Sequence, residues 1–257
     1  MQDILLISAI VIFCYMCAWF IWAQLIKNNG VVDIAWGLGF VLVTGVLGMT
    51  EEISLQNPRF ILFLMIALWG IRLSAHIAYR AAGKSEDFRY QNFRKSWGRY
   101  PLLGAFFQVF MLQGLIMGIL LLPVYLAYAD TTALLFPTTW QWVGLAVFAV
   151  GFVFEAVGDY QLLRFSAKAE NRGHIITHGL WKYTRHPNYF GESILWWGIG
   201  IYSLSFENGW FALVSPIVIT YLLTRVSGIP MLERKYEKNP EFRAYAARTP
   251  AFFPKFR

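Results

Sequence analysis

Residues 178–192 read HGLWKYTRHPNYFGE, and they mark the point where a polar loop turns into an apolar helix. Pro187 has no backbone N–H and a fixed φ, so it predicts a helix boundary with His186 held outside the helical region. We expect the helix to run from about Asn188. Asn188 and Glu192 are then one turn apart on the same face. At the first turn of a membrane helix, an amide and a carboxylate are costly unless they contact a ligand, a partner or water.

The composition is typical of a membrane protein. The chain has 257 residues, of which 57% are hydrophobic and 18% aromatic. Most of its apolar runs reach the ~20 residues with which a helix crosses a bilayer, and the sixth is shorter. The runs are 4–26, 31–50, 60–79, 102–126, 139–158, 189–206 and 209–225. We therefore predict an all-α fold: a polytopic bundle of seven transmembrane helices that forms a single domain over residues 1–257.

Lysine and arginine are distributed unevenly over the predicted loops. On one side of the membrane Arg59 is the only such residue, whereas the other side carries the basic segments 80–101 and 164–185 and the tail from Arg225. The positive-inside rule then predicts an outside N-terminus and a cytoplasmic C-terminus. Most of the net charge of +7 serves this orientation and contacts lipid headgroups. Short loops fit a bacterial inner membrane and the endoplasmic reticulum equally.

Ionisable residues inside the predicted spans are informative because burying them in a bilayer is costly. They gather in the cytoplasmic half of the spans and are Asp33, Arg72, His76, Glu155, Asp159 and Glu192. Structural readings compete with functional ones, since Arg72 could be the partner of Asp33 or of Glu155. Asn188 could be only a helix cap, and Glu192 only the partner of an arginine. Together these groups predict a polar cavity that is open to the cytoplasm.

Two cytoplasmic loops supply the positive charge that an anionic ligand needs. Residues 80–101 and 159–187 combine arginines with aromatic residues and acidic ones. This combination suits a nucleotide, because guanidinium groups bind phosphate, rings stack and a carboxylate binds ribose hydroxyls. It also suits a lipid headgroup, and composition does not separate the two. No G-x-G-x-x-G or Walker motif occurs, so we expect no soluble dinucleotide-binding domain, and no metal site is predicted.

A set of motifs spread over nearly the whole chain resembles a known family. Gly179-Leu180-Trp181-Lys182-Tyr183, Arg185-His186-Pro187-Asn188-Tyr189 and Gly191-Glu192 are similar to the C-terminal domain of the steroid 5α-reductase family, above all to its bacterial branch of unknown function. Further matches are Asp33-x-x-Trp36-Gly37, Leu68-Trp69-Gly70-x-Arg72, Glu86-Asp87-x-Arg89-Tyr90, Gly158-Asp159-x-Gln161 and Ser227-Gly228-Ile229-Pro230-x-Leu232-Glu233. The resemblance implies a seven-helix membrane reductase that uses NADPH.

The resemblance also implies roles for single residues in the cofactor site, which it draws mainly from 80–101, 155–192 and 225–257. Asn188 corresponds to an asparagine that holds the nicotinamide carboxamide, and Glu192 and Asp159 to acidic residues near it. Tyr183 and Arg185 lie in the corresponding cofactor loop. The full set of expected cofactor-binding residues is Arg72, Arg80, Lys84, Arg89, Tyr90, Asp159, Arg164, Arg172, Tyr183, Arg185, His186, Asn188 and Glu192.

For catalysis the resemblance points to Asp33, Trp69 and Glu192. Asp33 falls where the steroid enzymes place a glutamate that engages the substrate ketone, and Trp69 where they place a tyrosine. A tryptophan N–H donates a hydrogen bond but does not transfer a proton. The histidine-rich last segment of those enzymes is also replaced, here by residues 227–230. Both departures weigh against a steroid itself and leave the cofactor site intact.

A second family shares the central motif. Arg-His-Pro-x-Tyr followed by a basic tail resembles isoprenylcysteine carboxyl methyltransferases, which bind S-adenosylmethionine. Those enzymes typically carry two adjacent glutamates before the tail, whereas this chain has only Glu233, and the pair Asn188 and Glu192 favours the reductase. A lipid-binding protein without catalytic activity is a third reading, and it should show neither cofactor binding nor turnover.

The sequence thus predicts a membrane-embedded, NADPH-dependent reductase of a carbon–carbon double bond in an apolar substrate, such as a steroid-like or other lipid enone. The substrate would enter from the bilayer, and membrane lipids are the other expected partners. Asp33 could stabilise the developing enolate oxygen only if it is protonated, which burial favours. No nucleic-acid partner is expected, and the sequence does not predict an oligomeric state.

Overall fold

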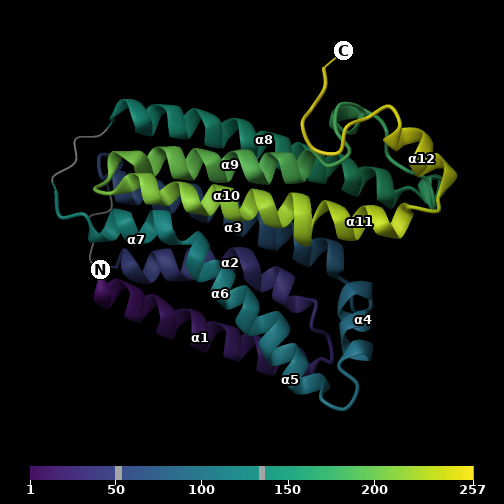
Figure 1. Cartoon of the computed structure of the whole chain (residues 1–257), viewed down its shortest axis with the longest axis horizontal. Coiled ribbons are helices and arrows are strands. Elements are labelled where there is room, and N and C mark those ends of the chain that lie inside the picture. The colour runs from purple at the N-terminus through teal and green to yellow at the C-terminus, as the bar shows by residue number, and fades with distance from the viewer. Residues whose placement is uncertain (50–53, 133–136, 257) are drawn as a thin grey trace. The chain divides into compact units, whose positions relative to one another are not determined.

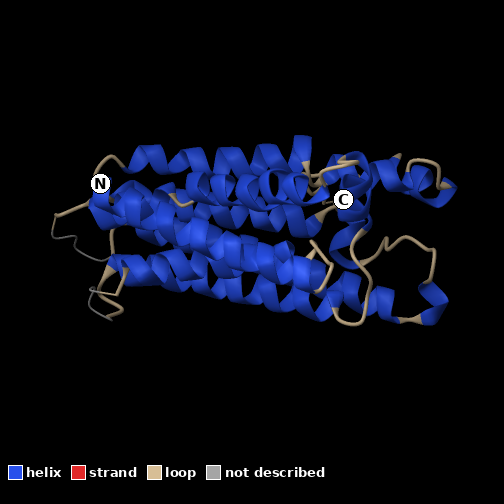
Figure 2. Cartoon of the chain, turned by 90° about the horizontal axis from the view of Figure 1, so that it is seen from below, coloured by secondary structure: helices blue, strands red, loops and turns tan. Residues whose placement is uncertain are grey.

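The computed structural model describes residues 1–49, 54–132 and 137–256, and within these ranges all regular secondary structure is helical, without any strand (Figure 2). This confirms the all-α fold class. The chain divides into two compact units. The first unit comprises Met1–Pro137 and Phe206–Gly209, and the second comprises Thr138–Ser205 and Trp210–Arg257. Each is described by itself below, and the prediction of one domain stays a prediction.

The first unit contains the N-terminal helices (Figure 1). They are α1 (Gln2–Leu25), α2 (Val31–Leu47), α3 (Pro58–Ala81), α4 (Phe88–Ser96), α5 (Pro101–Ala105), the π-helical turn η1 (Phe106–Met111), α6 (Leu112–Leu120) and α7 (Leu122–Ala129). Gly37 on α2 and Gly70 on α3 allow the two backbones to touch. A Cβ at Gly37 would lie 2.7 Å from the Ser74 hydroxyl, whose oxygen already accepts from the Leu38 N–H at 3.1 Å. This part of α2 therefore has no room for larger side chains.

The second unit is built on two long antiparallel helices (Figure 1). Its elements are α8 (Thr139–Ala167), the short turns η2 (Ala169–Asn171) and η3 (Gly179–Lys182), α9 (Pro187–Tyr202), η4 (Ser203–Ser205), η5 (Gly209–Leu213), α10 (Val214–Tyr221), the π-helical turn η6 (Leu222–Val226), α11 (Ile229–Tyr236) and α12 (Pro240–Ala246). Thr138 and Gln141 form a capping box at the start of α8. The buried Gln141 amide also donates to the Ser205 hydroxyl at 3.0 Å, which ties the start of α8 to the end of α9.

Glycines at seven-residue intervals bring α8 and α9 into backbone contact. On α8 they are Gly144, Gly151 and Gly158, and on α9 they are Gly191 and Gly198. A Cβ at Gly191 would lie 2.6 Å from the Gly151 carbonyl oxygen, and a Cβ at Gly198 would lie 2.7 Å from that of Gly144. These distances are far inside van der Waals contact, so the glycine positions along this seam have no room for a side chain. Close approach of this kind is typical of helix pairs in membranes.

Five helical segments are long and apolar enough to cross a membrane. They are Gln2–Leu25, Pro58–Ala81, Pro101–Leu120, Thr139–Ala167 and Gly209–Tyr236, among the residues that were described. The predicted second and sixth spans correspond to α2 and α9, which are shorter, with 17 and 16 residues. Residue 50, at the end of the predicted second span, lies outside the described residues. A multi-pass membrane protein is thus supported, while the seven-span count and the orientation stay predictions.

We predict that the N-terminus is outside and the C-terminus is cytoplasmic, because the basic loops alternate with poorly charged ones. A topology reporter fused to the C-terminus should be active only in its cytoplasmic form. A reporter inserted next to Asp130, between α7 and α8, should be active only in its external form. If both positions report the same side, the arrangement of seven spans is wrong.

Substituting Gly191 by alanine should destabilise the second unit. The new methyl group would force the backbones of α8 and α9 apart, and overpacking costs about 2 kcal/mol, or ~4–8 °C in the midpoint of thermal unfolding. Gly118→Ala on α6 is the matched control, since the Cβ there meets only the end of the Ile12 side chain, at 3.8 Å. The control should leave the midpoint unchanged or raise it slightly, because alanine favours helix. Equal midpoints in the two variants would contradict the seam.

Candidate functional site

Asn188 lies at the start of α9, where it presents its side chain to α8. The helix begins at Pro187, one residue before the predicted start, and its N-cap is His186. Asn188 is therefore inside the helix, and the alternative in which it merely caps the helix is wrong. Its amide nitrogen donates to the Asp159 carboxylate at 3.1 Å. Its amide oxygen is buried and has no hydrogen-bond partner in the part of the chain that the structure describes. The carboxamide is thus fixed at one end and presents an open acceptor at the other.

Three buried carboxyl-bearing residues lie on the same two helices, and one of them, Asp159, contacts Asn188. Glu155 and Asp159 lie one turn apart on α8, and Glu192 lies one turn beyond Asn188 on α9. All three residues are buried, with exposed fractions of 2%, 5% and 8%. The absence of a side chain at Gly158 allows the approach, because a Cβ there would already be 3.1 Å from the Asn188 backbone nitrogen. The structure therefore brings together the predicted residues Asp159 and Asn188, which are 29 positions apart, with Glu192 one turn further along α9.

The loop before α9 is held against α8 by two hydrogen bonds. The Trp181 indole N–H donates to the Gly158 carbonyl oxygen at 3.1 Å, and the Leu180 backbone N–H donates to the Gln161 side-chain oxygen at 2.9 Å. Gly179 has a φ of +63°, a conformation that favours glycine, and its missing Cβ leaves room for that glutamine. The motif residues 179–182 thus fix the path of the chain toward Asn188.

Arg185 and His186 both bind Glu233 on α11. The guanidinium group makes two parallel hydrogen bonds to the carboxylate, at 2.8 and 2.9 Å. His186 Nε2 lies 3.0 Å from one of the same oxygens. Arg185 Nη1 also donates to the backbone carbonyl oxygens of Ala246 and Thr249, at 3.2 and 2.6 Å. A bidentate arginine–carboxylate pair of this kind is strong and directional.

The C-terminal strap, which we define as residues 240–255, folds over the same loop. The Arg185 backbone N–H donates to the Pro250 carbonyl at 2.9 Å, and the Thr184 hydroxyl donates to the Phe252 carbonyl at 2.8 Å. The Tyr245 hydroxyl donates to the Trp181 carbonyl. Burial raises the pKa of Tyr245, so this hydroxyl keeps its proton at neutral pH. The strap thereby becomes part of the loop's support.

In the first unit, Asp33 receives two short contacts from α4. Arg89 Nη2 lies 2.6 Å from one carboxylate oxygen, and the Tyr90 hydroxyl donates to the other at 2.5 Å. The Asp33 carboxylate is thus held by an ion pair with Arg89 and a hydrogen bond from Tyr90, and its role as an acid stays a prediction. Arg72, which the sequence suggested as a partner of Asp33 or of Glu155, lies half-buried on α3.

The charges around α4 support this arrangement. Burial raises the pKa of the Tyr90 hydroxyl well above its ordinary value, and the Asp33 charge adds to the effect. Although burial would lower the pKa of Arg89, the nearby charge of Asp33 raises it. Asp87 caps α4 by accepting from the Arg89 N–H at 2.9 Å. Burial would raise the pKa of Asp87, but hydrogen bonds and charge from Arg89 lower it below its ordinary value. The stability that the ionised Asp87 contributes to the folded state is therefore lost as the pH falls through this lowered pKa.

The remaining predicted residues are a buried tryptophan, four exposed cations and a half-buried tyrosine. Trp69 is fully buried, with its ring edge-to-face on Phe40 at 5.3 Å, in a position typical of a core residue. The exposed cations are Arg80 and Lys84 in the first unit and Arg164 and Arg172 in the second. Tyr183 is half-buried and packs on Phe256, with 4.9 Å between the ring centroids.

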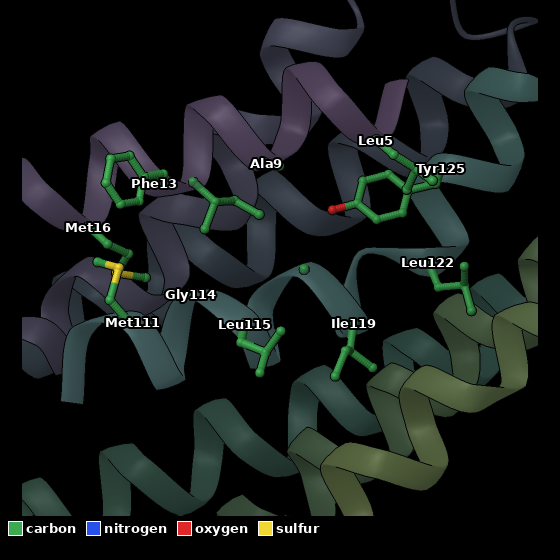
Figure 3. Close-up of a pocket in the computed structure, with 12 residues that line it drawn as sticks. Leu5, Ala9, Phe13, Met16, Met111, Gly114, Leu115, Ile119, Leu122 and Tyr125 are labelled. Atoms are coloured by element: carbon green, nitrogen blue, oxygen red, sulfur yellow. The ribbon is translucent and has the colours of Figure 1, made fainter. Parts of the chain in front are cut away.

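The first unit also carries an apolar groove of about 520 Å³ (Figure 3). It is lined by Leu5, Ala9, Ile12, Phe13 and Met16 of α1, Met111 of η1, Gly114, Leu115, Gly118 and Ile119 of α6, and Leu122 and Tyr125 of α7. Leu5, Phe13 and Leu115 are exposed, so the groove opens on an apolar surface. Its one polar side chain is Tyr125, whose hydroxyl points into the groove near one end (Figure 3). Sequence patterning gave no sign of this groove.

Sequence reasoning assigned no site role to Glu233. It appeared as the end of the motif 227–233 and as a departure from the methyltransferase pattern, although it is the residue on which Arg185 and His186 converge. The signal that could have found it is its place at the end of the motif 227–233, in a segment rich in lysine and arginine that follows the Arg-His motif in the chain. Thr184 and Tyr245, which hold the strap, were also missed, because their partners are backbone carbonyls more than 60 residues away in the sequence.

Comparison with known proteins identifies relatives without a described activity. A family model described as "Protein of unknown function (DUF1295)" matches residues 19–249. An uncharacterized protein of Schizosaccharomyces pombe is 26% identical over 264 aligned residues, which cover 89% of this chain and 73% of the relative. No solved structure matches the chain.

Substituting Arg89 by alanine should loosen α4. The change removes the guanidinium from Asp33 and Asp87, and a loss of ~1.4 kcal/mol, about that of one hydrogen bond to a charged group, corresponds to a tenfold change in an equilibrium. We therefore expect trypsin to cleave after Arg94 or Lys95 about ten times faster than in the unsubstituted protein. Lys84→Ala, in the exposed segment before α4, is the control and should not change the rate. Unchanged cleavage in the Arg89 variant would show that the ion pair does not hold the helix.

Proposed function

We propose a function for this chain, which belongs to the family described as "Protein of unknown function (DUF1295)". The proposed function is that of a membrane-embedded reductase that uses NADPH. Its reaction would saturate a carbon–carbon double bond conjugated to a carbonyl group in an apolar substrate. The proposal includes seven spans with a cytoplasmic C-terminus, so that the site around Asn188 opens toward the cytoplasmic nucleotide pool. It is carried by one observation: the fixed and half-satisfied carboxamide of Asn188.

The Asn188 carboxamide fits the amide end of a nicotinamide ring. Its nitrogen is committed to Asp159, which fixes the orientation of the group, and its buried oxygen lacks a donor. A buried acceptor without a partner costs about 1–3 kcal/mol, and the NH₂ of the nicotinamide carboxamide would remove this cost. Asp159 and Glu192 could accept further N–H or O–H groups of the same ligand. This set of acceptors therefore suits the N–H groups of an uncharged amide and not an anion.

The phosphate groups of the cofactor require positive charge outside this acidic surrounding. Arg164 and Arg172 are exposed in the second unit, within 24 residues of Asn188 along the chain. Arg164 contacts the Tyr160 hydroxyl at 3.2 Å, so an aromatic ring accompanies the guanidinium group. Arginine binds phosphate through paired hydrogen bonds, which supports NADPH over NADH because NADPH carries an additional 2′-phosphate.

When bound, NADPH would supply a hydride to the β-carbon of the conjugated double bond and leave as NADP⁺, and a proton from water would complete the saturated product. The chain's own contribution is to hold the carboxamide end through Asn188 and thereby orient the reacting face. Orientation of this kind supplies much of the acceleration in hydride transfer, since the reacting atoms must meet at about 3–3.5 Å.

The apolar groove in the first unit supports an apolar substrate. Its volume of about 520 Å³ lies within the usual range for small-molecule sites, and its lining is aliphatic and aromatic. Gly114 and Gly118 open its floor because they carry no side chain. A lipid that enters sideways from the bilayer would meet the groove without crossing a polar surface. At its end of the groove, the Tyr125 hydroxyl would accommodate a single polar oxygen group of the substrate.

We predict that NADPH stabilises the purified protein against heat more than NADH does at equal concentration, and that S-adenosylmethionine does not stabilise it. Asn188→Ala should weaken NADPH binding by roughly 1–3 kcal/mol and lower turnover of an enone lipid further, because the ring is no longer held in a reactive position. Thermal shifts and NADPH consumption measure the two effects. Arg172→Ala should instead weaken NADPH binding in a salt-sensitive way, and excess NADPH should restore its turnover.

Asn171→Ala is the matched control, since that amide only donates to the Phe165 carbonyl in the loop after α8. It should bind and turn over NADPH like the unsubstituted protein. Stabilisation by S-adenosylmethionine alone would assign the chain to the methyltransferases instead. Full activity of Asn188→Ser would remove this residue from the site and, with it, the main support for the reductase.

A further inference from the structure

We infer that Glu233 is the positioning residue of this site: it fixes the start of α9 through Arg185 and His186, and thereby the carboxamide of Asn188. The inference rests on the proposed function insofar as Asn188 contacts the nicotinamide. It assigns a role to a residue on α11 that lies 45 positions after Asn188 in the chain. It also assigns Arg185 to the support of the site and not to the cofactor.

The first step is the use of the Arg185 donors. A guanidinium group has five N–H donors. Four hydrogen bonds engage them, two to Glu233 and one each to the carbonyls of Ala246 and Thr249. The side chain is only 12% exposed. Little of it remains for a phosphate, whereas its planar geometry matches the Glu233 carboxylate and fixes both side chains.

The second step is the short covalent path from this pair to Asn188. His186, whose ring also binds Glu233, is followed by Pro187 and then by Asn188. The proline ring fixes one backbone dihedral, so this path has little freedom to absorb a displacement. The His186 ring in addition stacks on Tyr189, with 5.5 Å between centroids and 10° between planes. A movement of the Arg185–Glu233 pair is therefore transmitted to the first turn of α9.

The third step is the strap, which makes the pair part of a closed set of contacts. The Lys255 N–H donates to the Tyr183 carbonyl at 3.0 Å, and Phe252 packs edge-to-face on Phe190 of α9 at 5.7 Å. The carbonyls that Arg185 binds belong to the same strap. Loss of the Glu233 carboxylate would leave the Arg185 guanidinium group without its counter-charge, among backbone carbonyls. The contacts through which Arg185 holds both the strap and the loop before α9 would then weaken.

The test compares Glu233→Gln with Glu237→Gln in the full-length protein in lipid nanodiscs. Glu237 lies one turn further along, is exposed, and uses its backbone carbonyl, not its carboxylate, to accept from Arg243. Two ligands are titrated well below the unfolding temperature: NADPH, and 2′,5′-ADP, which has the phosphorylated adenosine but no nicotinamide. Hydrogen–deuterium exchange follows the backbone amides of residues 183–190 in the absence of ligand.

For Glu233→Gln we expect the NADPH dissociation constant to rise about tenfold, as loss of one charge-assisted contact would give, with no change for 2′,5′-ADP. Exchange at 183–190 should accelerate, and Glu237→Gln should match the unsubstituted protein in every measurement. Equal weakening of both ligands would overturn the inference, because it would indicate a general loss of structure. An unchanged NADPH constant would overturn it as well.

Failure of the reductase proposal has a different signature. If the unsubstituted protein binds neither ligand, the proposed function is wrong, and the exchange measurement alone decides on Glu233: acceleration at 183–190 supports its positioning role, and unchanged exchange overturns it. Should Glu233→Gln not fold, Arg185→Lys serves in its place, since lysine keeps the charge but not the paired hydrogen bonds.

Discussion

The backbone contact between α8 and α9 is the constraint on which the second unit depends. Glycines at 144, 151, 158, 191 and 198 leave no side chain at these five positions, so the backbones of the two helices approach closely there. In a bilayer, where apolar side chains gain little from leaving lipid, such close packing is a main source of helix association. It also sets the site, because the seam ends at Gly158 and Asn188. A wider spacing would place the Asn188 amide out of reach of Asp159, from which it now lies at 3.1 Å.

Local patterns predicted the elements well. Hydropathy identified the apolar segments, and Pro187 placed the start of α9 within one residue, because a missing N–H and a fixed φ act on the chain directly. Asn188 and Glu192 lie one turn apart on α9, where Glu192 is buried and Asn188 is half-buried. The sequence did not predict the interaction partners of these residues. Asp159 is 29 positions from Asn188, Glu233 is 48 from Arg185, and the strap carbonyls are more than 60 from theirs. Distances of this kind follow from tertiary packing, which periodicity does not encode.

Composition also treats all arginines alike, and the structure separates them. Arg89 and Arg185 are largely buried and bind carboxylates within their own unit, whereas Arg164 and Arg172 are exposed. The difference arises from desolvation: a guanidinium group that loses water must be compensated by a fixed partner, and only an exposed one retains donors for a mobile anion. Sequence reasoning placed all four in one anion site because the neighbouring residues, aromatic and acidic, are similar in each loop. Burial is the property that distinguishes support from ligand binding, and a linear pattern does not report it.

The choice of asparagine at position 188 follows from the same electrostatics. Its neighbours across and along the helices, Glu155, Asp159 and Glu192, are all carboxyl-bearing and buried. An aspartate there would add a further negative charge in a low-dielectric surrounding and would have no hydrogen to donate to Asp159. A serine could donate a hydrogen bond, but its single hydroxyl on a shorter side chain would not both reach Asp159 and present an acceptor on the opposite side. An amide donates to Asp159 through nitrogen and keeps an acceptor on the opposite side without adding charge. Among the described residues that acceptor is buried and has no donor, and in the proposed function it would accept from the neutral N–H group of the nicotinamide carboxamide.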